Sequence, residues 1–236
     1  MDISSISAMH RSTYEERQEN LGYLRQLYSF FALTLIIAVL WTNWCLRNTK
    51  LGTWVTTYWG LALAAAIIAL IILLICLFAP FARQSPINLV LWALFTITFA
   101  YAVSYLCVKD KSGLCWYTLC LLAAIAVAFA IYSFFSQNYL QSLSAMLFII
   151  LAALLVMVLF IVFTNISFLG MIFCTLGAII FGFYLNYDIR KMVRGNIYRN
   201  LKEDAPTGSV RLWGEVGLVF CRICEMLSGI FTKSGY

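Results

Sequence analysis

The chain has 236 residues, of which 63% are hydrophobic and only 11% are charged, and its formal net charge is +6. An average soluble domain is about 45–50% apolar and about 25% charged, so this composition excludes a soluble fold. The modest positive charge gives no reason to expect nucleic-acid binding.

The apolar residues form long unbroken runs rather than alternating with polar residues. Because lipid offers the backbone no hydrogen-bond partner, such runs predict membrane-spanning helices rather than a barrel. At about 20 residues per span, we expect an all-α membrane protein, a bundle of about seven transmembrane helices. The predicted spans, in chain order, are 24–46, 56–79, 87–108, 114–135, 141–164, 167–189 and 210–231.

The predicted domain organisation is simple. Residues 1–22 form a short cytoplasmic tail, and residues 23–236 form one seven-helix transmembrane domain. The seventh span is the weakest by composition because it contains Glu215, Arg222 and Glu225, so it either crosses fully or dips in and returns. We favour a full crossing.

Basic residues mark one side of the predicted bundle, which we call the basic end. They are Arg11, Arg17, Arg25, Arg83, Arg190, Lys191, Arg194, Arg199, Lys202 and Arg211. The loops on the other side hold Arg47, Lys50, Lys109 and Lys111. The positive-inside rule therefore places the N-terminus and the basic loop near 190–210 in the cytoplasm.

Small residues and cysteines suggest how the spans pack. Gly60 with Ala64, and Gly170, Gly177 and Gly182, recur at or near helical spacing and predict close helix contacts. Most of the eight cysteines lie in apolar runs, where a thiol behaves as a small hydrophobe. Two others, Cys107 and Cys115, bracket a short loop and would pair only if that loop faced an oxidising lumen.

Two acidic residues inside the spans are the main site candidates, because a charge at the centre of a span costs about 2.5–3.5 kcal/mol even on the lower scales. Asp188 lies near the end of the sixth span and Glu215 near the start of the seventh. These spans are antiparallel neighbours joined by the basic loop, so both acids fall within about two turns of the cytoplasmic face and can meet.

Two carboxylates held together in a low dielectric resist double ionisation, so they can share a proton near neutral pH. Such a pair would act as a pH sensor and would also offer oxygen ligands to a passing calcium ion. The alternative is that Asp188 pairs with Arg190 and Lys191 at the membrane surface and has only a structural role.

Accessory candidates follow from spacing. Arg222 lies seven residues after Glu215 and three before Glu225, so an intrahelical ion pair is the structural explanation. Polar side chains along the third span either bond between helices or line a cavity. They are Asn88, Thr96, Thr98 and Ser104.

Enzyme motifs are missing from the sequence. The single histidine, His10, lies in the tail, so neither a histidine-dependent protease dyad nor an HExxH zinc site can be built. No Walker or dinucleotide-binding glycine pattern occurs. We therefore expect no enzyme activity and no cofactor.

Four segments of the sequence carry a recognisable pattern. They are Tyr23–Ile36 at the start of span one, Ser85–Ser104 with its Pro-x-Asn opening, Leu176–Gly195 with its Tyr-Asp pair, and Ser209–Phe220 in span seven. Together they resemble the transmembrane Bax inhibitor motif family, which includes the Lifeguard and Golgi anti-apoptotic proteins. The short N-terminal tail is also similar to that of compact viral members, so cellular and viral origins both stay open.

The resemblance implies a pH-sensitive calcium leak of the endoplasmic reticulum or Golgi, or of the plasma membrane, which lowers stored calcium and dampens apoptosis. It puts Asp188 at the family's first functional carboxylate and Glu215 at the second. Calcium is then the permeant ion rather than a bound cofactor. Three departures from the family pattern bear on gating: Trp-Gly-Glu stands where Tyr-Leu-Asp is common, Ile-Arg-Lys follows the Tyr-Asp pair in place of Thr-Gln, and span two has no internal arginine to latch the acids.

A second hypothesis is a non-conducting membrane protein that modulates death or immune pathways by binding client membrane proteins. Its two acids would then be structural. Expected partners are membrane lipid in both cases, calcium in the first and other membrane proteins in the second.

Overall fold

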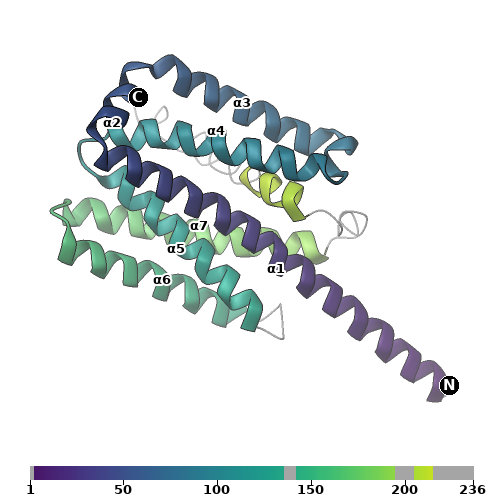
Figure 1. The fold of residues 1–236 in the computed structure, drawn as a ribbon. Coiled ribbons are helices and arrows are strands. Elements are labelled where there is room, and N and C mark those ends of the chain that lie inside the picture. The colour runs from purple at the N-terminus through teal and green to yellow at the C-terminus, as the bar shows by residue number, and fades with distance from the viewer. Residues whose placement is uncertain (1–2, 136–141, 195–204, 215–236) are drawn as a thin grey trace, which may run out of the picture.

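The computed structural model describes the backbone of residues 3–135, 142–194 and 205–214, and the side chains of residues 21–82, 84–135, 146–187 and 205–214. The elements in order are α1 (Ile3–Arg47), α2 (Thr49–Thr57), α3 (Trp59–Phe78), the 3-10 turn η1 (Pro80–Arg83), α4 (Ile87–Lys109), α5 (Leu114–Phe135), α6 (Ser142–Phe163) and α7 (Phe168–Arg194) (Figure 1). Residues 205–214 are also helical. The predicted all-α membrane fold is confirmed.

Six helical segments in this part of the chain are long and apolar enough to cross a membrane. They are Leu21–Arg47, Trp59–Phe78, Ile87–Lys109, Leu114–Phe135, Met146–Phe163 and Phe168–Tyr187. Their bounds differ by only a few residues from the first six predicted spans. The seventh predicted span, 210–231, is described only as far as residue 214.

Two features of the α1–α3 region go beyond the predicted spans. Helix α1 begins at Ile3, so the backbone of the predicted tail continues the first span as one long helix that extends past the bundle (Figure 1). Helix α2 fills the loop between the first two spans. Asn48 caps α2, because its Oδ1 accepts hydrogen bonds from the amides of Lys50 and Leu51 at 3.1 and 3.4 Å. We call this end of the bundle the α2 end.

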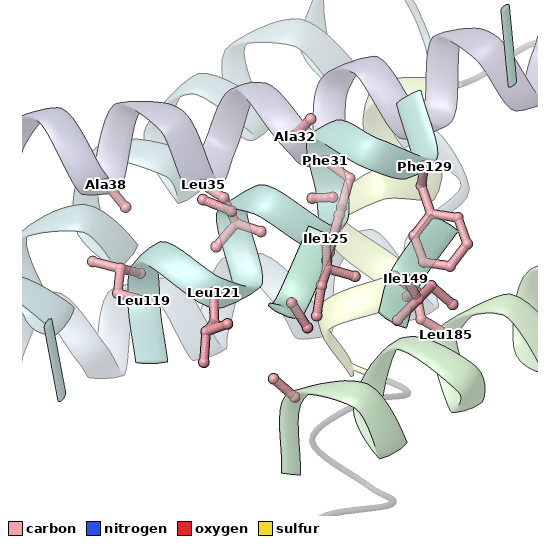
Figure 2. Close-up of a cluster of buried hydrophobic side chains, with 14 of the residues drawn as sticks. Phe31, Ala32, Leu35, Ala38, Leu119, Leu121, Ile125, Phe129, Ile149 and Leu185 are labelled. Carbon is pink, nitrogen blue, oxygen red and sulfur yellow. The ribbon is translucent and has the colours of Figure 1, made fainter. Parts of the chain in front are cut away.

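A large core joins α1, α5, α6 and α7. At its centre Phe31, Leu35, Ile125, Ile149 and Leu185 are each at most 1% exposed (Figure 2). Because lipid tails are as apolar as leucine, close van der Waals contact rather than the release of water holds such a core together. A small core lies between α3 and α4 and consists of Ala69, Ile72, Cys76, Trp92, Phe95 and Val210.

The outer faces of α3 and α6 are apolar and exposed. Leu63 and Leu70 of α3 are 54% and 56% exposed, and Leu151 and Leu155 of α6 are 62% and 60% exposed. A soluble protein rarely exposes such continuous apolar surface. These faces therefore suit contact with lipid.

Arg25 ties α1 to the last turn of α5. Its Nε donates to the Ser133 carbonyl at 3.0 Å and a terminal nitrogen donates to the Phe134 carbonyl at 3.4 Å. The last carbonyls of a helix have no partner within the helix and carry its negative dipole end. The positive charge of Arg25, at the edge of the first span, is therefore balanced by backbone carbonyl oxygens.

The glycine contacts are only partly as predicted. A Cβ on Gly182 would lie 2.8 Å from Cγ2 of Ile149, and one on Gly170 would lie 2.9 Å from the Leu114 methyls. Close approach is therefore confirmed at these two positions. The prediction of a close contact is wrong at Gly177 and Gly60, where a Cβ would meet nothing within 4 Å. These two glycines lie on helix faces turned away from neighbouring helices.

The two α7 glycines give a matched test of this packing. Gly182→Ala should lower the free energy of unfolding by about 1–3 kcal/mol, because the added methyl overpacks the α6–α7 contact. Gly177→Ala should leave stability unchanged or slightly raised, because alanine favours the helix. Thermal unfolding of both variants in detergent measures the difference, and equal melting temperatures would contradict the assigned contact.

Asp110 organises the turn between α4 and α5. Its Oδ1 accepts from the hydroxyl and the amide of Ser112 at 2.6 and 2.9 Å, and its Oδ2 accepts from the Cys115 amide at 2.8 Å. The hydrogen bonds from Ser112 and from the backbone hold the pKa of Asp110 below its ordinary value of 3.8. Cys107 and Cys115, which flank this turn, are both free thiols, so the pairing considered above is not formed.

The Asp110 turn predicts a pH-dependent contribution to stability. Because folding lowers this pKa, the stabilisation is present above 3.8 and is lost as the pH falls through the folded-state value. Asp110→Ala should cost about 0.5–2 kcal/mol at neutral pH, as loss of a helix cap does. Melting curves should show the variant and the unmodified protein converging at low pH, whereas a constant gap would contradict the role of the ionised carboxylate.

Candidate functional site

Residues 205–214 form a helical segment enclosed by the bundle, which we call the central segment. Its residues Ala205, Thr207, Ser209, Val210 and Leu212 are each at most 2% exposed. Pro206 stands in the first turn, where its missing amide proton costs no helical hydrogen bond. In Figure 1 the segment lies between α4 and α7.

The central segment joins the two cores. Val210 belongs to the small core and Leu212 to the large core, and Trp213 packs against both. Because successive residues of a helix point in different directions, one short helix can serve both cores only from a position between them.

Arg211 anchors the central segment to the last turn of α3. Its Nε donates to the Cys76 carbonyl at 2.8 Å, and a terminal nitrogen donates to the Leu77 carbonyl at 3.0 Å. The residue four positions after Cys76 is Pro80, which has no amide proton to donate. The arginine supplies the donor that the chain of α3 lacks. Nearby, the Thr207 hydroxyl donates to the Ala82 carbonyl at 3.0 Å.

Trp213 lies in a cluster of rings from three elements. Its ring centroid is 4.9 Å from that of Phe31 on α1, and 4.5 and 6.4 Å from those of Phe99 and Phe95 on α4. We call Phe31, Phe95, Phe99 and Trp213 the ring cluster. The indole Nε1 is buried and has no hydrogen-bond partner among the described residues. The offset and tilted ring contacts hold the indole in place.

A hydrogen-bonded triad joins α1 to α4 beside the ring cluster. Trp92 Nε1 donates to the Thr34 hydroxyl at 3.1 Å, and the Thr34 and Thr96 hydroxyls lie 3.2 Å apart. Of the polar residues predicted along this span, Thr96 therefore bonds between helices. Thr98 instead bonds to carbonyls of its own helix.

The predicted site residues are described to different extents. Asn88 is buried, and its Oδ1 accepts from the Leu89 amide at 2.7 Å. The backbone of Asp188 belongs to α7, but its side chain lies outside the described residues, as do Glu215, Arg222 and Glu225 entirely. The predicted pairing of the two acids stays a prediction.

Sequence reasoning missed two residues that organise the centre of the bundle, Arg211 and Trp213. A signal for Arg211 was present in Pro80, which leaves a carbonyl of α3 without its usual donor. No local signal marks Trp213, because a tryptophan in an apolar run is ordinary in a membrane helix.

Comparison with known proteins identifies the family. A family model described as "Inhibitor of apoptosis-promoting Bax1" matches residues 21–233. The chain belongs to the Bax inhibitor family. It is therefore a multi-pass membrane protein of a family described as inhibitors of apoptosis-promoting Bax1, and the resemblance stated from its motifs is confirmed.

Similar proteins match over most of the chain. Protein LIFEGUARD 1 of Arabidopsis thaliana is 23% identical over 91% of this chain and 92% of its own length. Protein LIFEGUARD 4 of the same plant is 26% identical over 81% and 79%. An uncharacterised protein of Helicobacter pylori is 25% identical over 95% and 96%. No solved structure matches significantly, and none of these matches tests a viral origin.

The Arg211 anchor can be tested with a paired substitution. Lysine lacks the planar fork of donors, so Arg211→Lys should lose at least one carbonyl bond and about 1–3 kcal/mol of stability. Hydrogen exchange in residues 205–214 should rise. Arg47→Lys, at an exposed arginine of the α2 end, is the matched control and should change neither quantity. Equal effects of the two substitutions would contradict the anchoring role.

Proposed function

We propose that this protein is a pH-sensitive calcium leak channel of intracellular membranes that lowers stored calcium and thereby dampens apoptosis. It acts without enzymatic chemistry. Its N-terminus faces the cytoplasm, and the endoplasmic reticulum or Golgi is its membrane.

The observation that best supports this proposal is the shared burial of Leu185 and Leu212. Both belong to the large core, where they are 1% and 0% exposed. Leu185 precedes Asp188 by three residues and Leu212 precedes Glu215 by three residues. Two buried residues of one core thus each lie three positions before one of the acids, which supports a common site.

A carboxylate pair in such surroundings would work as a proton-controlled gate. When the two carboxylates share one proton, the pair has a single negative charge and needs little stabilisation by a nearby cation. When the proton leaves, two charges repel each other and attract a divalent cation, whose preferred ligands are oxygens. Deprotonation therefore opens the route in this mechanism.

Membership of the Bax inhibitor family supports the cellular side of the proposal. The family description names inhibition of an apoptosis-promoting protein. A leak that lowers stored calcium would reduce the amount available for release during a death signal. The effect on apoptosis then needs no direct contact with a death protein.

Calcium flux into liposomes tests the gate. With purified protein and an internal calcium dye, influx should be faster at about pH 8 than at about pH 6, on either side of the titration of a coupled acid pair. The variant with both Asp188→Asn and Glu215→Gln should show low flux that does not change with pH, because neutral amides imitate the protonated pair. In cells, Asp188→Asn should restore stored calcium.

Asp110→Asn is the matched control, because it removes an acid of the α4–α5 turn that is not part of the predicted pair. It should keep the pH response. A double variant that responds to pH like the unmodified protein would overturn the gate. Absence of flux from every folded variant would instead support the non-conducting alternative, which pull-down of stoichiometric client membrane proteins would then establish.

A further inference from the structure

Two thiols face each other where α4 ends and α5 begins. Cys107 lies in the last turn of α4 and is 2% exposed, whereas Cys115 is the second residue of α5 and is half-buried. Both are free thiols, and they are hydrogen-bonded to each other. We call them the turn thiols. Two sulfur atoms that are already in contact need only a small shift to reach the geometry of a disulfide.

The turn between the two helices fixes this contact. The carboxylate of Asp110 accepts from the Cys115 amide at 2.8 Å, so it holds the first turn of α5 against the end of α4. Gly113 has a φ of 74°, a left-handed conformation that lets the chain reverse within a few residues. A Cβ on this glycine would lie 3.2 Å from Cδ1 of Ile166. The thiols therefore meet because the backbone between them has a defined path.

Other described cysteines lie in different surroundings. Cys45 is fully buried on α1, and its thiol is hydrogen-bonded to Ser104. Cys120 and Cys174 are half-buried on α5 and α7. The turn thiols differ from these in that one thiol is partly exposed to solutes and has a second, buried thiol as its direct neighbour.

We propose that the turn thiols are a thiol–disulfide exchange site, which low-molecular-weight disulfides such as glutathione disulfide convert reversibly to an intramolecular disulfide. The site lies at the α2 end, because Val108, next to Cys107, packs against Gly52 of α2. In cells the inference rests on the proposed function, in which the N-terminus is cytoplasmic and the α2 end faces a lumen. Such lumens are oxidising, whereas cytosolic thiols stay reduced. The site would then lie on the side of the membrane that supplies its oxidant.

The exchange consists of two balanced steps. Cys115, the more exposed thiol, loses its proton, and its thiolate attacks one sulfur of glutathione disulfide. A mixed disulfide forms, and one glutathione leaves as a thiolate that takes up a proton. Cys107 then loses its proton and attacks the Cys115 sulfur, which forms the protein disulfide and releases the second glutathione. Two electrons thus pass from the two protein thiols to glutathione disulfide.

Two neighbours act on the attacking Cys115 thiolate in opposite directions. The first turn of α5 presents amide dipoles, which stabilise an anion with the equivalent of about half a positive charge. The ionised carboxylate of Asp110, bonded to the amide of the same residue, repels an anion with a full charge. We therefore expect slow exchange, on the order of minutes to hours.

Thiol counting in a glutathione buffer tests the site. The full-length protein in detergent, held for hours in glutathione and its disulfide at the poise of the endoplasmic reticulum, should lose two thiols that alkylate after unfolding. Trypsin cuts after Lys109 and Lys111, between the two cysteines, so mass spectrometry should find the Cys107 and Cys115 peptides joined. A reductant should separate them. The oxidised protein should also melt at a higher temperature than the reduced protein, because the bond restrains the unfolded chain.

Serine variants test the order of the steps. Cys107→Ser should stop after the first step and carry one glutathione on Cys115. Cys115→Ser should carry neither a glutathione nor a link, because the remaining thiol is buried. Cys174→Ser removes another half-buried thiol, from α7, and as matched control should form the link like the unmodified protein.

The outcomes separate this inference from the proposed function. Folded protein that stays unlinked in the oxidising buffer, or a link that is lost in Cys174→Ser, overturns the exchange site and leaves the calcium leak intact. A link that forms in purified protein but is absent from protein whose thiols were blocked at cell lysis supports the site and overturns the proposed orientation. A link without calcium flux supports the site and overturns the leak.

Discussion

The bond between the Arg211 guanidinium and the Cys76 carbonyl fixes the centre of this bundle. Inside a membrane, a backbone carbonyl without a donor costs several kcal/mol, because lipid provides no substitute for water. Pro80 leaves the Cys76 carbonyl at the end of α3 without its helical donor. Arg211, 135 residues further along the chain, donates to that carbonyl instead. Arg25 acts in the same way on the last turn of α5. Both arginines thus donate hydrogen bonds to carbonyls at the ends of neighbouring helices.

The central segment is held where two cores meet, and this limits how it can move. Val210, Leu212 and Trp213 occupy sites in cores that share few other residues. Packed interiors do not deform gradually, so a displacement of the segment must repack both cores together.

Much of the fold could be predicted from the sequence, because hydropathy alone determines where a helix can cross lipid. The exceptions have physical reasons. Helix α2 is only nine residues long and amphipathic, so no hydropathy window marks it, although Asn48 is a recognisable cap. Gly182 and Gly177 look alike in sequence and differ only in which helix face meets a neighbour.

The candidate site could be predicted less fully. The rarity of Asp188 and Glu215 inside apolar runs drew attention to α7 and to the helical segment after it, both of which contribute residues to the large core. The contacts of Arg211 and Trp213 join residues far apart in sequence, so they could not be found from spacing.

The unbroken length of α1 has a mechanical consequence. A continuous helix is stiff, and the stretch from Ile3 to Leu21 is about 27 Å long at 1.5 Å per residue. Further along the same rod lie Phe31 and Thr34, which face the middle of the bundle. Because α1 has no break between the projecting residues and the bundle, a force applied to the projecting part would tilt the whole helix and so displace Phe31 and Thr34.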